Sequence, residues 1–388
     1  MVKVPGFLSL QQICERPEAT FEEVGVGDPK EAVSALTYTS GTTGLPKGTQ
    51  MTHHNLVATI VQSLNIFSLT EHDVVLNRTP ITHGSGFIIG MTYLALGVTT
   101  VMGQPMMSAQ EFIETASAYK VSSTIFFPAQ LYSFINETET RGYRAPTIKT
   151  VFVCGSRISP VIVQKALKLF HSTSFKNSYA LTETCGVLCM PPSAGIAYDT
   201  IGVPIPNVQM KVVDLTTGKV LGPGEWGELV VKAPTVMKGY YKRLEATTDV
   251  LSADGWLRTG DCGYYDAKGW FYFVERLKEM IKCLDNQVAP AEVEDVLLSH
   301  EAVAEAVVVG IPDVRYGEAP TAFVVLKASF QQPSDAIKTE LRQLVERECA
   351  VHKHLHGGLH IVDKLPKNET GKVQRSVLCV SYVKEVEK

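Results

Sequence analysis

The sequence lacks the patterns that mark several common classes of protein. Its eight cysteines contain no C-x-x-C pair, which argues against a zinc site built from paired cysteines, and a chain of 388 residues needs no disulfide framework. The 36 lysines and arginines are outnumbered by 40 aspartates and glutamates, so no basic excess indicates a nucleic-acid partner. The richest apolar stretch, residues 86–103, is interrupted by glycines and threonines, so we predict a buried helix and strand there and no transmembrane segment.

The ends of the sequence give an expectation for the compartment. The first residues contain no long apolar segment of the kind that a secretory signal requires. The last four residues, EVEK, differ from the peroxisomal address S-K-L. We therefore expect a cytoplasmic protein, with the peroxisome as the alternative.

Hydrophobic patterning predicts an α/β fold with more than one domain. From residue 36 to about 153, helical segments alternate with apolar runs such as VSSTIFFPAQL and KTVFVCGS, which are typical of strands buried on both faces of a parallel sheet. From about Ile201, short alternating segments between turn signals predict antiparallel hairpins and a β-barrel-like subdomain. We predict a large N-terminal α/β domain that includes this subdomain, residues 1–275, and a small α+β C-terminal domain, residues 276–388.

The stretch YTSGTTGLPKG, from Tyr38 to Gly48, has the composition of a phosphate-binding loop. Its glycines let backbone N–H groups turn toward an anion, its hydroxyls add donors, and Lys47 adds a positive charge. The Walker A spacing cannot be fitted to it, which excludes a P-loop nucleoside triphosphatase. We expect a strand before the loop and, after it, a helix with Thr52 as its N-cap, a setting that suits anion binding. A solvated polar loop would be the simpler interpretation if this stretch stood alone.

Three further motifs follow in order: SYALTETCG (Ser178–Gly186), WLRTGDCGYYDAKGWFYFVERLKEMIK (Trp256–Lys282) and LPKNETGKVQR (Leu365–Arg375). Together with the loop they resemble the adenylate-forming superfamily, which includes acyl-CoA synthetases, 4-coumarate–CoA ligases and beetle luciferases. The resemblance covers nearly the whole chain. It implies an AMP-binding adenylation domain over residues 1–275 and a C-terminal lid domain over residues 276–388. It also implies ATP, Mg²⁺ and CoA as ligands and a fatty or aromatic carboxylic acid as the substrate.

The resemblance implies roles in ATP binding for residues of several motifs. Tyr179 would lie near the adenine, Asp261 would accept hydrogen bonds from both ribose hydroxyls, and Arg276 would contact the ribose or a phosphate. Thr182 would bind a phosphate and Glu183 would hold Mg²⁺. The full set implied for ATP is Thr39, Ser40, Gly41, Thr42, Thr43, Gly44, Lys47, Gly155, Tyr179, Asp261 and Arg276.

The resemblance also implies residues for the chemical steps. Lys372 would bridge the carboxylate and the phosphate, where a cation lowers the barrier by roughly 3–4 kcal/mol. On local sequence alone, Lys372 would be a solvated loop lysine and Asp261 a turn residue. The residues implied for catalysis are Lys372, His83 and Thr182. Those implied for the acyl pocket are His83, Gly84, Ser85 and Ala180, and those for the CoA step are Lys282 and Gln287.

Three features depart from the family pattern. Only 37 residues precede Tyr38, so we expect a truncated form that lacks the N-terminal portion of the large domain. Asp285, in CLDNQ, stands where the family has a glycine beside the CoA arm, and its side chain and charge are expected to hinder the thioester step more than adenylation. The loop CGSRIS, Cys154–Ser159, replaces a GGAP-like loop, and the bulkier Ser156 and Arg157 are expected to reshape the adenine or acyl pocket.

These features together predict an acid–CoA ligase. ATP and a carboxylate would give an acyl-adenylate and pyrophosphate, after which the C-terminal domain would rotate about Glu275–Arg276. The rotation would withdraw Lys372 and bring the Lys282 loop to the site for transfer to CoA. Two alternatives stay open: luciferase-like oxygenation of an adenylate, and a truncated, non-catalytic nucleotide binder. The sequence does not determine the acid, the effect of Asp285 on the CoA step, or the oligomeric state.

Overall fold

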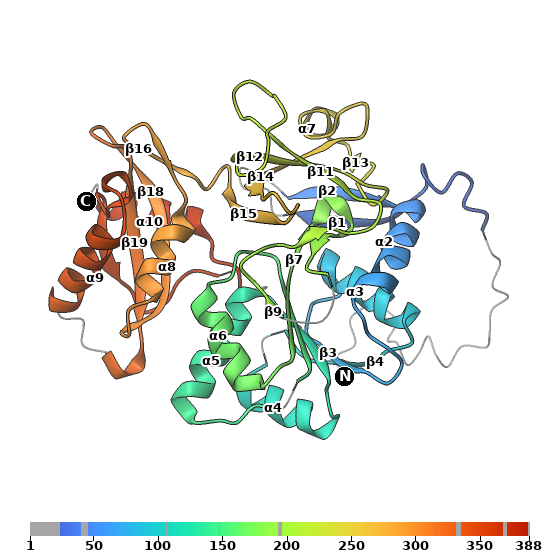
Figure 1. Ribbon diagram of the computed structural model, residues 1–388, viewed down its shortest axis with the longest axis horizontal. Helices are drawn as coiled ribbons and strands as arrows, with labels where there is room; N and C mark the ends of the chain where they lie inside the picture. Colours follow the sequence, from blue (N-terminus) through green and yellow to red (C-terminus); the bar gives the residue numbers. More distant parts are fainter. Residues whose placement is uncertain are drawn as a thin grey trace, which may run out of the picture.

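The chain folds into a large unit and a small C-terminal unit that lie side by side (Figure 1). Figure 1 shows the small unit in orange and red, with the chain entering it after β15 (Phe271–Arg276). The computed structural model describes residues 24–39, 46–105, 107–146, 148–192, 196–330, 335–367 and 371–386.

The large unit is built around an eight-stranded sheet. Its strands are β3 (Val74–Asn77), β4 (Thr99–Met102), β5 (Ser123–Phe126), β6 (Thr150–Cys154), β7 (Ser174–Leu181), β8 (Gly186–Met190), β9 (Ile196–Ala197) and β10 (Val203–Pro204). They lie in the order β10-β8-β7-β6-β5-β3-β4, with β9 beside β7. Neighbours from β4 to β7 are parallel, whereas β8 and β10 are antiparallel additions. The predicted parallel core is therefore confirmed, and the two apolar runs that predicted buried strands form β5 and β6 at its centre.

Helices cover both faces of this sheet. Phe112, Phe126 and Phe134 belong to the core under one set of helices, and Tyr93 and Phe152 belong to the core under the other. Every one of these rings is almost completely buried, as expected for a sheet that is covered on both faces. The helices of the large unit's core are α2 (His53–Ile66), α3 (Gly84–Ala95), α4 (Ala109–Ala118), α5 (Pro128–Arg141) and α6 (Pro160–Phe170). The run at residues 86–103 forms most of α3 and then β4, as predicted.

Local side-chain bonds fix where α2 begins. The Thr52 hydroxyl accepts the backbone N–H of Asn55, and the Asn55 side-chain oxygen accepts the N–H of Thr52, which completes a capping box. The Asn55 amide also donates to the carbonyls of Pro234 and Val236, at 2.9 and 3.0 Å. Since those carbonyls lie far along the chain, the cap also ties α2 to the antiparallel part of the large unit.

Two antiparallel sheets complete the large unit. One contains β1 (Val33–Thr39), β2 (Lys47–Thr52) and β13 (Gly239–Tyr240); the other contains β11 (Gln209–Val213), β12 (Gly227–Lys232), β14 (Leu257–Tyr265) and β15. The second sheet has the order β11-β12-β14-β15, and its outer strands do not pair with each other in the described part of the chain. The hairpins are therefore confirmed, but they form an open sheet where a barrel-like closure was predicted. Two short helices, η1 (Thr182–Thr184) and α7 (Leu244–Thr248), lie in this region.

The setting of the predicted phosphate loop differs from the expectation. β1 and β2 pair antiparallel, with Thr39 opposite Lys47, so the loop connects two strands of a hairpin. The helix α2 begins only after β2, at the cap residue Thr52. The strand before the loop and the helix capped by Thr52 after it are confirmed, but the prediction missed β2, because the segment KGTQMT is a strand through its pairing with β1 and β13. Residues 40–45 themselves lie outside the described residues.

The small unit is an α+β arrangement, as predicted. Its strands are β16 (Ile281–Cys283), β17 (Asn286–Val288), β18 (Val303–Asp313), β19 (Gly317–Leu326) and β20 (Gly358–Ile361), and its helices are α8 (Pro290–Leu298), η2 (Ala328–Phe330), α9 (Asp335–Glu348), η3 (Val351–Lys353) and α10 (Arg375–Val386). The sheet order is β17-β16-β19-β18, with β20 parallel to β19. Val293 and Leu297 of α8 pack with Leu341 and Val345 of α9 in a core that is separate from those of the large unit. Among the described residues, no helix has the length and apolarity needed to span a membrane.

Candidate active site

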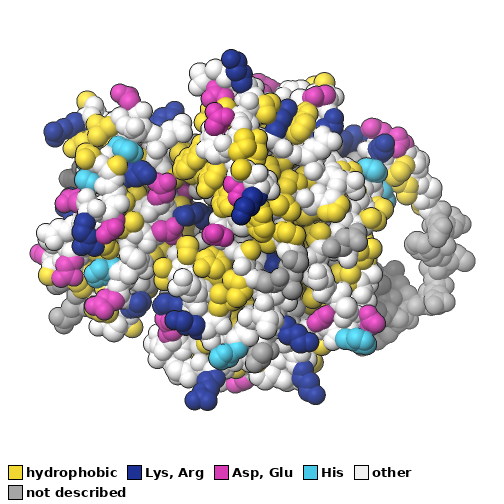
Figure 2. Space-filling view, in the orientation of Figure 1, with side chains coloured by type: hydrophobic (Ala, Val, Ile, Leu, Met, Phe, Trp, Pro, Cys, Tyr) yellow, Lys and Arg dark blue, Asp and Glu magenta, His cyan; other side chains and the backbone are white. Residues whose placement is uncertain are grey.

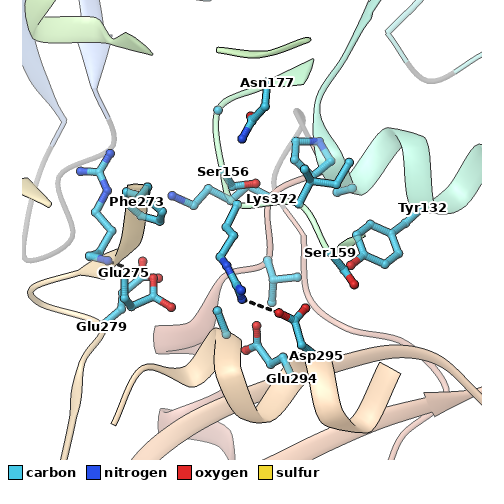
Figure 3. A pocket seen from close by; sticks show the side chains of 18 of the residues that line it. Tyr132, Ser156, Ser159, Asn177, Phe273, Glu275, Glu279, Glu294, Asp295 and Lys372 are labelled. Atoms are coloured by element: carbon cyan, nitrogen blue, oxygen red, sulfur yellow. Dashed lines mark hydrogen bonds and ion pairs between the residues drawn. The ribbon is translucent and has the colours of Figure 1, made fainter. Parts of the chain in front are cut away.

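A cavity of about 300 Å³ lies between the two units (Figure 3). The large unit contributes the loop 155–159 after β6, the end of β7, and parts of β14 and β15. The small unit contributes α8 and the segments 365–367 and 372–375. Acidic and basic side chains gather along the seam where the two units meet (Figure 2). The cavity is therefore an interdomain site with charged groups of both signs.

Asp261 is the buried anion of this cavity. It lies on β14 directly opposite Arg276 on β15, and directly opposed residues of antiparallel strands share one face of the sheet. The Nε atom of Arg276 lies 2.8 Å from Asp261 Oδ1, and the Tyr179 hydroxyl donates to Oδ2 at 2.6 Å. Burial raises the pKa of the Asp261 carboxyl, although Arg276, Tyr179 and Lys372 act in the opposite direction. The structure thus brings together three residues that were predicted from two separate motifs.

Lys372 reaches the same cavity from the small unit (Figure 3). Its side chain is exposed, and its charge acts on the Asp261 carboxyl. The preceding residue, Gly371, has φ +82°, and a Cβ at this position would lie 3.3 Å from the Cβ of Ala129 on α5. The glycine therefore allows the segment that carries Lys372 to lie against the large unit.

Glu183 and Lys47 meet at one aromatic ring near this cavity. Glu183 lies in η1, and its Oε1 accepts a hydrogen bond of 2.8 Å from the Tyr240 hydroxyl. The Nζ atom of Lys47 lies 4.8 Å from the centroid of the Tyr240 ring. Burial raises the pKa of the Tyr240 hydroxyl above its ordinary value, so this group stays a donor at neutral pH. Since Thr39 pairs with Lys47, the base of the predicted phosphate loop lies near the predicted Mg²⁺ ligand.

His83 packs against Phe127 and lies outside the lining of the cavity. His83 caps α3, its Nδ1 lies 2.6 Å from the Ser85 hydroxyl, and its ring centroid is 5.5 Å from that of Phe127. Gly155 meets the same ring: its φ is +97°, and a Cβ there would lie 2.9 Å from Phe127. Burial lowers the pKa of His83, so the imidazole is neutral at pH 7. Of the four residues predicted for the acyl pocket, Ala180 lines the cavity, while His83, Gly84 and Ser85 do not.

Lys282 and Gln287 are not brought to this cavity. Both line a separate depression on the small unit, together with Asp285 and Tyr316. Leu284 and Asp285 have φ of +50° and +58° and connect β16 to β17 as a tight turn. Asp285 thus occupies a backbone conformation that favours glycine, which is the residue that the resemblance led us to expect there.

Two charged arrangements at the cavity were not predicted as sites. Arg157 on the loop after β6 pairs with Asp295 on α8, with 2.6 Å between Nη1 and Oδ2 (Figure 3). Arg375 lies 3.1 Å from a Glu279 oxygen and 2.5 Å from a Glu294 oxygen, and also donates to the carbonyl of Val308 at 2.6 Å. The sequence predicted only that the bulky Arg157 would reshape the pocket. No local pattern identifies its partner Asp295, which lies more than a hundred residues further along the chain.

Glu275 lies beside this second arrangement at the end of β15. Its side chain is only 5% exposed, and its Oε1 accepts the backbone N–H of Arg276 at 2.9 Å. The pKa of the Glu275 carboxyl is raised to about 7, mainly by burial; Arg375 acts against this rise, and Glu294 and Glu279 add to it. The carboxyl is therefore close to half-protonated at neutral pH.

Two family profiles match the chain. The profile described as "AMP-binding enzyme" matches residues 6–241, which is more than half of the sequence. The chain belongs to the AMP-binding enzyme family. The profile described as "AMP-binding enzyme C-terminal domain" matches residues 292–372. The matches confirm the resemblance to the adenylate-forming superfamily that the four motifs indicated.

The sequence relatives of the chain include two kinds of protein. It is 34% identical over 363 residues to luciferin 4-monooxygenase of Photuris pensylvanica, a match that covers 92% of this chain and 65% of the relative. It is 34% identical over 354 residues to the probable 4-coumarate–CoA ligase 1 of Dictyostelium discoideum, which covers 90% of this chain and 64% of the relative. The chain therefore spans about 65% of the length of these relatives.

Solved structures of family members have the same fold. The o-succinylbenzoate CoA synthetase (MenE) of Bacillus subtilis, in complex with its acyl-adenylate intermediate, matches with a TM-score of 0.76 at 31% identity, over 90% of this chain and 69% of that chain. ATP-bound MatB of Rhodopseudomonas palustris matches with a TM-score of 0.81 at 26% identity, over 92% and 70%. The chain thus has a large N-terminal and a smaller C-terminal domain that match those of known adenylate-forming proteins over the part they share.

Proposed function

We propose that the protein activates a carboxylic acid with ATP and transfers the acyl group to CoA. The observation that carries this proposal is the interdomain cavity, where Asp261, Arg276 and Tyr179 of the large unit face Lys372 of the small unit. A buried anion for a sugar and a mobile cation for a reacting phosphate suit adenylation of a carboxylate. The division into an adenylation domain, residues 1–275, and a lid domain, residues 276–388, is part of the proposal.

The nucleoside end of ATP would bind beside Asp261. An ionised carboxylate only accepts hydrogen bonds, so it can hold the two ribose hydroxyls once its bonds to Tyr179 and Arg276 adjust. The adenine would lie between Tyr179 and the loop that begins at Gly155. Arg276, which lies beside Asp261, would contact the ribose or a phosphate.

The phosphates would extend toward η1 and the base of the β1–β2 hairpin. Thr182, Thr39 and Lys47 would contact them, together with the loop residues Ser40, Gly41, Thr42, Thr43 and Gly44. Glu183 fits a magnesium ligand: one of its oxygens holds Tyr240, and a single carboxylate supplemented by phosphate oxygens suits Mg²⁺. No group of three or more His, Cys, Asp or Glu side chains forms a metal cluster in the described part of the chain, which agrees with an ion held mainly by ATP. Bound there, Mg²⁺ would neutralise charge on the phosphates.

In the first step, a carboxylate oxygen would attack the α-phosphorus and the bond to pyrophosphate would break. Pyrophosphate would leave with the bonding electron pair, giving the acyl-adenylate. The ammonium of Lys372 would lie between the two anions and stabilise the charge that develops as they approach. The acyl group would extend past Ala180 toward Phe127, whose ring contacts both Gly155 and His83. Neutral His83, with Gly84 and Ser85, would close that end of the site.

In the second step, the CoA sulfur would attack the acyl carbonyl carbon and AMP would leave. Lys282 and Gln287 lie on a different face of the small unit from Lys372, so one orientation of this unit cannot present both sets. Rotation of the small unit about Glu275 and Arg276 would withdraw Lys372 from the cavity and bring Lys282 and Gln287 to it. The orientation described here, with Lys372 at the cavity, suits the first step.

Pyrophosphate release tests the first step. The purified chain is incubated with ATP, Mg²⁺ and a panel of aromatic and fatty acids, and pyrophosphate is measured with an enzyme-coupled assay. We expect release with at least one acid, and a loss of about 10²- to 10³-fold in the Lys372→Ala variant. The absence of release with every acid, from protein shown to be folded by circular dichroism, would refute the proposal and favour a non-catalytic nucleotide binder.

The second step has a competing proposal. Identity to luciferin 4-monooxygenase equals identity to the coumarate ligase relative, so an adenylate oxygenase is the alternative. Mass spectrometry for an acyl-CoA product, run beside a light measurement with luciferin, ATP and oxygen, separates the two. Thioester without light supports the ligase, and light without thioester supports the oxygenase.

A further inference from the structure

We propose that Arg157 and Asp295 form a latch that holds the small unit in the orientation of the adenylation step. The proposal rests on the function given above, because a latch matters only if the two steps need two orientations. The two residues would act as positioning residues that set the balance between adenylation and transfer to CoA.

The pair joins the two units directly. Arg157 lies in the loop between β6 and α6 of the large unit, and Asp295 lies on α8 of the small unit. Their charged atoms are 2.6 Å apart, and the side chains are only 35% and 26% exposed. Both residues line the interdomain cavity. A half-buried pair of this kind is screened less by solvent than an ordinary surface pair.

Each partner is fixed within its own unit. Asp295 neighbours Glu294, which is held by Arg375, so α8 is anchored to the rest of the small unit. Arg157 lies two residues after Gly155, whose backbone is packed against Phe127. Because neither partner is on a freely moving segment, rotation of the small unit would have to separate the two charges.

The groups around the pair indicate why its loss should favour a different orientation of the small unit. Burial raises the pKa of the Asp295 carboxyl, while Arg157 lowers it and the adjacent Glu294 raises it. Across the cavity, Tyr132 and Ser159 of the large unit face Asp295 (Figure 3). Without Arg157, the Asp295 carboxyl would lose the cation that it contacts on the large unit, while Glu294 beside it is already paired with Arg375. Loss of the arginine should therefore shift the small unit away from this orientation.

Tryptic cleavage at Lys278 measures the orientation without reference to activity. Lys278 is exposed in the short connection between β15 and β16, where cleavage requires that the connection open. We expect Arg157→Gln and Asp295→Asn each to speed cleavage at Lys278 by about three- to tenfold, and the double variant to add little. Fragments are identified by mass spectrometry.

A matched ion pair inside the large unit provides the control. Lys165 on α6 lies 2.9 Å from Glu139 on α5, at comparable exposure, but this pair does not join the two units. Lys165→Gln should leave cleavage at Lys278 unchanged. Equal acceleration in Lys165→Gln, or fully additive effects in the Arg157 and Asp295 variants, would overturn the latch.

The two half-reactions test the consequence for catalysis. We expect Asp295→Asn, which breaks the pair without changing the loop at Gly155, to slow pyrophosphate release by about three- to tenfold while thioester formation from preformed acyl-adenylate is unchanged or faster. The reversed pair, Arg157→Asp with Asp295→Arg, should restore both rates and the slow cleavage. Equal slowing of both half-reactions, with no recovery in the reversed pair, would refute the proposal. If no acid supports adenylation, the proposed function fails, but the cleavage experiment still decides whether the latch exists.

Discussion

Protonation of Glu275 should make the stability of the protein depend on pH in a direction opposite to that of most carboxylates. The carboxyl is 5% exposed, and burial raises its pKa from 4.5 to about 7. A carboxyl whose pKa is raised by folding contributes its full stabilisation below the pKa that it has in the unfolded chain. This contribution to the free energy of unfolding is lost as the pH rises through the pKa of the folded state. The difference between 4.5 and about 7 corresponds to roughly 3 kcal/mol of lost stability above neutral pH.

The variant Glu275→Gln isolates this effect because glutamine keeps the shape and does not titrate. Thermal midpoints of both proteins are compared at about pH 5, 6, 7 and 8. We expect the stability of the variant relative to the wild type to increase as the pH rises, by up to roughly 3 kcal/mol at about pH 8. Glu279 and Glu294 raise the pKa and Arg375 lowers it, so Arg375→Met should steepen the wild-type dependence. A difference between Glu275→Gln and wild type that stays constant over this range would refute the reasoning.

Three further predictions concern other charged residues. Arg78 is 4% exposed and lies over the rings of Phe112 and Phe126, and burial lowers its pKa to about 10. Because a buried charge is costly, Arg78→Met should raise the free energy of unfolding by about 1–2 kcal/mol, measured by urea unfolding. A decrease of that size would contradict this prediction. Asp285→Gly should speed thioester formation several-fold and leave pyrophosphate release unchanged, because glycine adopts the same positive φ without a charged side chain. A variant whose thioester formation is no faster than that of the wild type would count against this prediction. Lys372→Arg should retain more pyrophosphate release than Lys372→Ala, and equal loss in the two variants would show that charge alone does not explain the role of this lysine.

Sequence patterns predicted the parts of the fold that depend on local or repeated signals. The apolar runs of β5 and β6 and the cap at Thr52 were predictable because a buried strand and a helix start have short-range signatures. The hairpin around the phosphate loop could not be predicted, since β2 is recognisable as a strand only through its partners β1 and β13. An open sheet and a barrel have the same alternation, so the sequence could not distinguish them.

The candidate site divides in the same way. Asp261, Tyr179 and Arg276 come from motifs long enough to be recognised, and the structure brings them within hydrogen-bonding distance. The pairing of Arg157 with Asp295 depends on how two units dock, for which one sequence carries no signal. The raised pKa of Glu275 likewise arises from burial by distant segments.

The final helix has a consequence for any shortened version of the protein. Arg375 opens α10, and its one guanidinium contacts Glu279 of the interdomain connection, Glu294 of α8 and the main chain of β18. A deletion ending just before this residue would keep every motif through Lys372, yet it would leave these acidic groups facing one another in a buried space. Arg375 is therefore part of the joint between the two units, although it lies beyond the last residue with a predicted catalytic role.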